Sequence, residues 1–141
     1  MIDTPKFEVG ESITVQKVVN EHDTGLNYGT GKLKEFFAMP SLMALMIEGS
    51  TKLLDDRLPE GFVTVGYQAC ITHEKPSMIG ETVSVKVEVK KFDGNRVELE
   101  MLAYDEVGIV GKGTHVRAVV NKTSLIKRAE KREERLSSLD F

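Results

Sequence analysis

The sequence predicts an α+β protein in which one antiparallel β-sheet wraps around a central helix. Residues 42–47 form an uninterrupted apolar run, which is typical of a helix that is covered on every side. Four strand-like segments follow Phe62, and the turn sequence Asp93-Gly94-Asn95 joins two of them as a hairpin. Strands that follow one another through short turns pair antiparallel, so the pattern excludes a parallel α/β fold.

The size and charge of the chain limit its organisation and its partners. Residues 1–141 are expected to form a single domain. The net charge of -3 offers no basic surface for nucleic acid. The apolar run is too short to cross a membrane, which takes about 20 residues. The single cysteine, Cys70, suits a reducing compartment, and we expect a cytoplasmic protein. The three histidines lack the spacing of metal ligands, and neither a metal nor a cofactor is expected.

The first half of the chain predicts a strand, a loop and the central helix. Residues 13–19 are rich in β-branched side chains and predict a strand. Residues 22–32 contain three glycines but lack the spacing of a phosphate-binding loop, so we expect a flexible connection. Pro40 suits the first position of the helix, which leaves Met39 at the N-cap.

Alternation of apolar and polar residues predicts the strands that follow. In residues 63–73 the side chains expected to face the core are Val63, Val65, Tyr67, Ala69, Ile71 and His73. In the next two strands they are Val83, Val85, Val87 and Val89, then Val97, Leu99, Met101 and Ala103. A last strand at residues 109–121 leads into a charged surface helix at residues 123–137, capped by Asn121 or Thr123.

Two segments resemble those of a known enzyme family. Residues 73–83 read His-Glu-Lys-Pro-Ser-Met-Ile-Gly-Glu-Thr-Val, and residues 113–117 read Gly-Thr-His-Val-Arg. Together with the Ala-Met-Pro start of the helix, their order and spacing resemble the hotdog-fold thioesterases, in particular the fluoroacetyl-CoA thioesterase-like branch. The resemblance implies a sheet wrapped around the helix, a homodimer whose sheets join edge to edge, possible higher oligomers, and a CoA thioester bound between the subunits.

The resemblance also implies candidate catalytic and binding residues. That branch uses a threonine at the helix start, a glutamate two turns later, and a histidine at the end of the next strand. The histidine corresponds to His73, which would act as a general base. Gly66 corresponds to a glycine whose N–H lies near the thioester carbonyl.

The threonine and glutamate positions of the family fall on Met39 and Ile47 in this chain. Ser41 and Glu48 lie nearby, two residues and one residue further along. Glu48 is a candidate to orient His73 or to activate water, and the alternative is an exposed ion pair with Lys52. Ser41 is the nearest hydroxyl and is a candidate for substrate binding.

These residues leave two functional hypotheses open. The first is an acyl-CoA thioesterase that hydrolyses a small or medium acyl-CoA to the free acid and CoA, with His73 as base. The second is a non-hydrolytic acyl-CoA-binding protein, which the apolar Met39 and Ile47 would favour. For the charged C-terminal helix, a solvated surface is the simplest interpretation, and phosphate binding by Lys127, Arg128 or Lys131 is the alternative.

Overall fold

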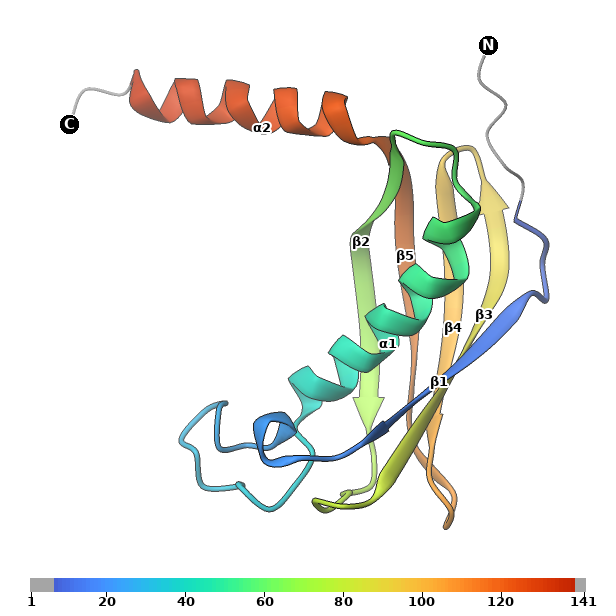
Figure 1. Cartoon of the computed structure of the whole chain (residues 1–141), viewed down its shortest axis with the longest axis vertical. Coiled ribbons are helices and arrows are strands. Elements are labelled where there is room, and N and C mark those ends of the chain that lie inside the picture. Colours follow the sequence, from blue (N-terminus) through green and yellow to red (C-terminus); the bar gives the residue numbers. More distant parts are fainter. Residues whose placement is uncertain (1–6, 139–141) are drawn as a thin grey trace.

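Five strands form one antiparallel sheet with the order β1-β3-β4-β5-β2 (Figure 1). The structure is a computed structural model, and it describes residues 7–138. The strands are β1 (Ser12–Val18), β2 (Phe62–His73), β3 (Thr82–Asp93), β4 (Arg96–Tyr104) and β5 (Ile109–Asn121). The predicted α+β class with a single antiparallel sheet is confirmed. Strand β2 lies at one edge of the sheet, so one side of its backbone has no partner strand among residues 7–138.

The central strands follow the predicted alternation from Val83 to Val89 in β3 and from Val97 to Ala103 in β4, and the register of β3 shifts between Val89 and Lys91. All the predicted inward side chains of these two strands are buried. On the outer face, Glu88 lies directly opposite Glu100 across the two strands. Lys90 Nζ lies 2.6 Å from a Glu88 oxygen and 3.3 Å from a Glu100 oxygen, and it thereby bridges two carboxylates that would otherwise repel each other.

Helix α1 (Met39–Leu54) packs across the concave face of the sheet (Figure 1). It begins one residue earlier than predicted, with Ala38 as the N-cap and Pro40 in the first turn. Its core-facing side chains include Leu42, Leu45, Met46, Leu53 and Leu54.

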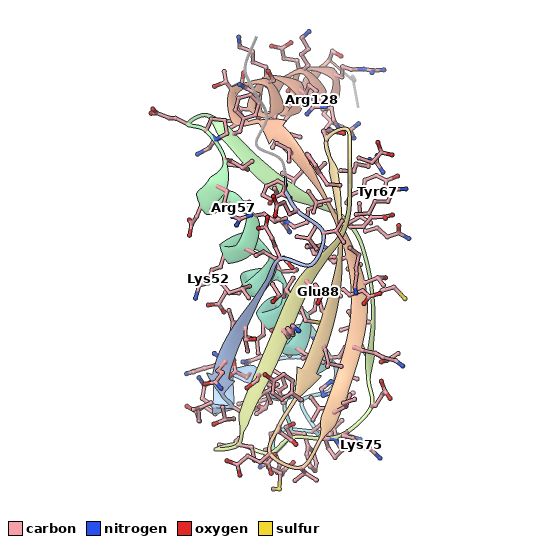
Figure 2. The ribbon with its side chains drawn as sticks, turned by 90° about the vertical axis from the view of Figure 1, so that its right-hand side faces the viewer. Lys52, Arg57, Tyr67, Lys75, Glu88 and Arg128 are labelled. Carbon is pink, nitrogen blue, oxygen red and sulfur yellow. The ribbon has the colours of Figure 1, made fainter. Side chains whose placement is uncertain are left out.

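The expectation that α1 would be covered on every side is wrong for the single chain. Ala44, Glu48 and Lys52 form an exposed flank of the helix, and Figure 2 shows Lys52 pointing away from the sheet. The apolar run therefore corresponds to the buried side of α1 and part of its margin, because the part of the chain that the structure describes covers only the side of the helix that faces the sheet.

The first half of β2 faces the opposite way from the prediction. Thr64 is buried and pairs with buried Val119 of β5, so Val63 and Val65 point to the outer face. A β-bulge between Gly66 and Gln68 then changes the phase of the strand, and Tyr67 at the bulge is 61% exposed.

Beyond the bulge, β2 agrees with the prediction. Ala69, Ile71 and His73 lie opposite His115, Gly113 and Gly111, on the face that carries α1. Cys70 is exposed on the opposite face from His73, because neighbouring residues of a strand alternate.

Helix α2 (Lys122–Ser137) leaves the sheet at the end of β5 and projects away from it (Figure 1). The side chain of Asn121 caps it by accepting a hydrogen bond from the Ser124 N–H at 3.0 Å, so one of the two predicted caps is present. None of its side chains is buried. Two short 3₁₀ turns, η1 (Glu21–Asp23) and η2 (Asp55–Arg57), complete the elements. Within residues 7–138, no helix is long and apolar enough to span a membrane.

Candidate active site

His73 is the last residue of β2, and its ring lies at the start of helix α1. The ring packs edge to face against Phe37, with the ring centroids 6.1 Å apart and the planes at 75°. His73 Nε2 is buried and has no hydrogen-bond partner among the described residues. Burial lowers the pKa of His73 below its ordinary value of 6.5, because the imidazolium form is less well solvated there. The ring is therefore neutral at neutral pH and can accept a proton.

A cleft of about 660 Å³ opens beside His73. Residues from the loop at positions 25–38 form one wall, Met39 and Pro40 of α1 form the second, and residues 73–76 form the third. The lining is largely apolar, with Leu33, Phe36 and Met39 among its side chains. Lys32 and Lys75 also contribute to the lining and give the cleft two cationic groups.

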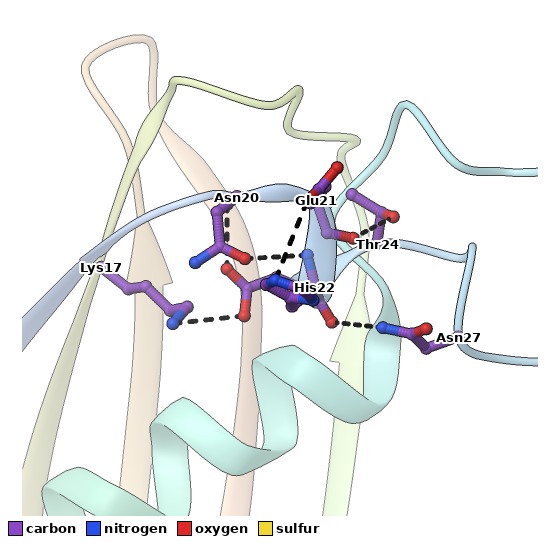
Figure 3. Close-up of polar contacts among 7 residues, drawn as sticks. Lys17, Asn20, Glu21, His22, Thr24 and Asn27 are labelled. Carbon is purple, nitrogen blue, oxygen red and sulfur yellow. Dashed lines mark hydrogen bonds and ion pairs between the residues drawn. The ribbon is translucent and has the colours of Figure 1, made fainter.

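The start of the loop that forms the first wall is held by hydrogen bonds among residues 20–27 (Figure 3). Asn20 caps the short turn η1 through a capping box with Asp23. Thr24 Oγ1 donates a hydrogen bond to the carbonyl oxygen of Glu21 at 2.8 Å, and Asn27 Nδ2 donates to the carbonyl oxygen of His22 at 3.0 Å. The expectation that this loop is only a flexible connection is therefore incomplete, because the segment is a hydrogen-bonded wall of the cleft.

The end of the same loop is tied to the segment that follows His73. The Phe37 N–H donates to the carbonyl oxygen of Ser77 at 2.8 Å, and the Ala38 N–H donates to the carbonyl oxygen of Asp23 at 2.9 Å. These bonds place Phe37 against His73 and set the direction in which α1 begins.

The match to a family profile covers most of the chain. Residues 8–123 match the family described as fluoroacetyl-CoA-specific thioesterase. The chain belongs to this family. A fluoroacetyl-CoA thioesterase from Streptantibioticus cattleyicolor is 30% identical over 120 residues, which cover 82% of this chain and 86% of the relative.

Solved structures of related proteins have the same fold as this chain. A hot-dog-like protein from Thermanaerovibrio acidaminovorans has 36% identity and a TM-score of 0.84, with coverage of 89% of this chain and 93% of that protein. A variant of the fluoroacetyl-CoA thioesterase FlK in complex with acetyl-CoA has 27% identity and a TM-score of 0.84, with coverage of 89% and 98%. The predicted hotdog fold, with a central helix and a C-terminal helix, is confirmed.

Two of the six candidate catalytic and binding residues of this thioesterase line the cleft of the single chain. They are His73 and Met39, and Met39 is 50% exposed there. Ile47 lies two turns further along α1 and is half-buried. Ser41 is buried in the first turn, where its N–H donates to the carbonyl oxygen of Ala38 at 3.0 Å. None of the lining atoms belongs to Ser41 or Ile47.

The other two predicted residues lie elsewhere in the chain. The Glu48 side chain is 52% exposed and its carboxylate lies 3.0 Å from Lys52 Nζ, which is the exposed ion pair that the sequence offered as the alternative. Gly66 lies in the edge strand β2, opposite Arg117. Figure 2 places Arg128 of α2 at the end of the molecule opposite Lys75, so the basic residues of α2 lie far from the cleft of their own chain.

Sequence analysis missed a buried polar cluster between β2 and β5. Arg117 and His115 are both buried, and Arg117 Nη1 lies 3.1 Å from His115 Nε2. Arg117 Nε donates to Thr64 Oγ1 at 2.8 Å, and Thr64 Oγ1 in turn donates to Asp55 Oδ1. The alternation of His115 with Gly111 and Gly113 predicts a structural role for this histidine, but it does not predict Arg117 as its partner. Two polar residues at alternate positions of a core strand are themselves an indication of such a cluster.

Proposed function

We propose that this thioesterase hydrolyses a small or medium acyl-CoA, with His73 as the general base. The observation that carries the proposal is a neutral imidazole with an unpartnered ring nitrogen, half-buried beside an apolar cleft. His73 takes a proton from water as the water oxygen forms a bond to the thioester carbonyl carbon. The carbon–sulfur bond then breaks, and the imidazolium returns the proton to the sulfur of CoA. The products are the free acid and CoA.

The cleft supports a CoA ester as the substrate. Its volume lies within the range of small-molecule sites, roughly 300–1,000 Å³, and its apolar lining suits a hydrocarbon acyl chain. Lys32 and Lys75 provide positive charge for the phosphates of CoA. The relative FlK, whose variant binds acetyl-CoA, shares the fold and supports the same class of ligand.

The proposal assigns Met39 and Ile47 to the positions where related enzymes carry threonine and glutamate. Met39 supports this assignment because it lines the cleft at the start of α1. Glu48 and Ser41 would then contribute only if the first turns of α1 meet a second chain, since neither lines the cleft within one chain. Gly66 would likewise offer its N–H to the thioester carbonyl from the edge of the sheet.

A homodimer, and possibly a higher oligomer, is part of the same proposal. Strand β2 is a long edge strand without proline, and Tyr67 through Cys70 are exposed along it. Such an edge pairs readily with another strand, and here the natural partner is β2 of a second copy. We also propose a cytoplasmic location, because Cys70 is an exposed free thiol that a reducing compartment would keep reduced.

A non-hydrolytic acyl-CoA-binding protein is the second candidate function. The observation that favours it is Met39, which lines the cleft beside His73 but carries neither a hydroxyl nor a carboxylate. In this case the cleft would bind the ester, and His73 would have no water to activate.

Release of free CoA thiol from short, branched and aromatic acyl-CoAs separates the two candidates. We expect turnover of at least one ester by the wild-type protein and its loss in His73→Ala, while calorimetric binding of a non-hydrolysable acyl-CoA thioether persists in both. Stoichiometric binding of the esters without any turnover, unchanged by His73→Ala, would overturn the enzymatic function and favour the binding protein.

A further inference from the structure

We propose that His115 and Arg117 are positioning residues that hold the bulge in β2 and thereby turn His73 into the cleft. The inference rests on the proposed role of His73. It concerns how the fold places that residue, and neither His115 nor Arg117 lines the cleft itself.

The bulge decides which face of the sheet His73 occupies. Thr64 faces α1 and His73 lies an odd number of positions later, so in an unbroken strand the two side chains would point to opposite faces. The extra residue at Tyr67 shifts the phase by one, and His73 faces α1 as a result. Without the bulge, either His73 or Thr64 would have to point to the outer face.

The Arg117–His115 pair binds the backbone on both sides of this bulge. Before the bulge, Arg117 Nη2 donates to the carbonyl oxygen of Thr64 at 2.9 Å. After the bulge, His115 Nδ1 donates to the carbonyl oxygen of Gln68 at 2.8 Å. Arg117 Nη1 donates to His115 Nε2 and joins the two contacts into one unit.

The hydrogen bonds also fix the state of His115. A carbonyl oxygen can only accept, so Nδ1 must carry the proton, and a guanidinium can only donate, so Nε2 must be unprotonated. His115 is therefore a neutral imidazole with a defined tautomer, and both of its nitrogens are engaged. Burial, followed by the nearby charge of Arg117, lowers the pKa of His115, while its hydrogen bond to Gln68 opposes that shift.

Two glycines of β5 complete the arrangement beyond the bulge. A Cβ atom at Gly113 would lie 2.7 Å from the Cys70 carbonyl oxygen. One at Gly111 would lie 3.5 Å from the Cα atom of His73 and 3.2 Å from Leu42 of α1. The inward residues of β5 thus act on β2 in two ways. Gly111 and Gly113 allow the backbone of β5 to lie close to β2 near His73, and the Arg117–His115 pair holds the bulge.

Core packing alone does not account for a buried arginine at this place. Removing a guanidinium from water is costly, and well-packed apolar side chains of similar volume often fill such a site with equal stability. Apolar side chains, however, could not bind carbonyl groups on both sides of a bulge. The contacts of Arg117 and His115 therefore favour a role in setting the phase of β2.

The test compares His115→Leu with His115→Asn, because asparagine keeps a donor near the position of Nδ1 and leucine does not. Two readouts are independent of catalysis. One is the pKa of His73 from the NMR titration of its ring, and the other is the rate at which Cys70, the only cysteine, reacts with a disulfide reagent. Turnover of the best acyl-CoA gives kcat and KM as a third readout.

In His115→Leu we expect the pKa of His73 to rise toward 6.5, the reaction of Cys70 to slow as its side chain turns inward, and kcat to fall with little change in KM. A displacement of about 1 Å can cost roughly a hundredfold in rate. His115→Asn should restore most of the wild-type His73 pKa, Cys70 reaction rate and kcat. Val89→Ala, in a strand separated from β2 by β4 and β5, is the matched control that lowers stability without moving the pKa of His73.

Deletion of Tyr67 is the second variant, and it removes the extra residue, so that His73 lies an even number of positions after Thr64 and faces α1 without a bulge. If the variant folds, it should keep the wild-type His73 pKa and Cys70 reactivity, and adding His115→Leu should no longer change either one. If it does not fold, the comparison of His115→Leu with His115→Asn is the test. A folded His115→Leu protein with an unchanged His73 pKa and unchanged Cys70 reactivity would overturn the positioning role. Failure of the proposed function is a different result, since the wild-type protein would then show no turnover while both structural readouts still responded.

Discussion

The ring of Phe37 meets the ring of His73 edge to face, and this contact joins the loop before α1 to the end of β2. Phe37 is buried, and its backbone N–H is bound to Ser77 on the far side of His73 along the chain. One aromatic side chain therefore covers the candidate base and belongs to the wall of the cleft. Five predictions concern the chemistry at this contact and on the adjacent helix.

Replacement of His73 by alanine should reduce the rate of thiol release by about 10²–10⁴, the usual contribution of a well-placed general base. Steady-state kinetics with the best acyl-CoA measures this loss. His22→Ala is the matched control, because His22 is an exposed histidine outside the lining of the cleft. Equal activity of the two variants would exclude His73 as the base.

The pH dependence should show a base that titrates below pH 6.5. Since burial lowers the pKa of His73, the unprotonated form persists into mildly acidic solution. A plot of kcat/KM against pH should therefore have an acid limb whose midpoint lies below 6.5, and His73→Gln should lack this limb. A midpoint above 6.5 would contradict the buried position of the ring.

The lowered pKa of His73 also makes the free energy of unfolding decrease as the solution becomes acidic. His73 has a lower pKa in the folded state than in the unfolded chain, so the unfolded state binds a proton first as the pH falls. The stabilisation is complete above pH 6.5 and is lost as the pH falls from there toward the native pKa. Urea titrations at several pH values should show a decrease in the free energy of unfolding over this window, and His73→Gln should reduce the decrease.

The double substitution Met39→Thr and Ile47→Glu should raise thiol release, because it returns a hydroxyl and a carboxylate to the two positions assigned by family resemblance. Comparison of kcat for the double variant and for each single variant measures the gain and its additivity. The control is Met43→Thr, a polar substitution on the same helix outside the lining of the cleft. No increase would show that the assignment of Met39 and Ile47 to those positions is wrong.

Glu48→Gln should have little effect on stability. An exposed pair four residues apart on a helix contributes about 0.5 kcal/mol or less, and Glu48 pairs with Lys52 in this way. Chemical denaturation measures the change, with Lys52→Gln as the reciprocal control. A loss of turnover of a hundredfold or more in Glu48→Gln alone would instead assign the carboxylate a catalytic role, which a second chain would have to complete.

The inward residues of β3 and β4 could be predicted because each strand has one apolar buried face and one largely polar face, although the register shift after Val89 could not. The four inward valines between Val83 and Val89 alternate with the outward residues Ser84, Lys86, Glu88 and Lys90. Such a pattern leaves a single possible register for the pairing of the strands. The extent of α1 followed in the same way from its apolar run and from Pro40.

Strand β2 could not be predicted in full because both of its faces carry apolar residues in the first half. Val63 and Val65 fit an inward face as well as Thr64 does, and alternation alone cannot detect an inserted residue. Gly66 was the available signal, since a glycine within a strand often marks a bulge. The cleft was not predictable either, because the loop at positions 25–38 acquires its shape from hydrogen bonds such as that between Phe37 and Ser77.

Helix α2 has a consequence for how the molecule unfolds. None of its side chains is buried, and at its first residue the Lys122 N–H donates a hydrogen bond to the carbonyl oxygen of Gly61 at 2.8 Å. In an isolated chain its amide protons should exchange with solvent through local fraying, long before those of β3 and β4, which open only with the whole sheet. Slow exchange along α2 at high protein concentration would therefore report that this helix rests against a second molecule.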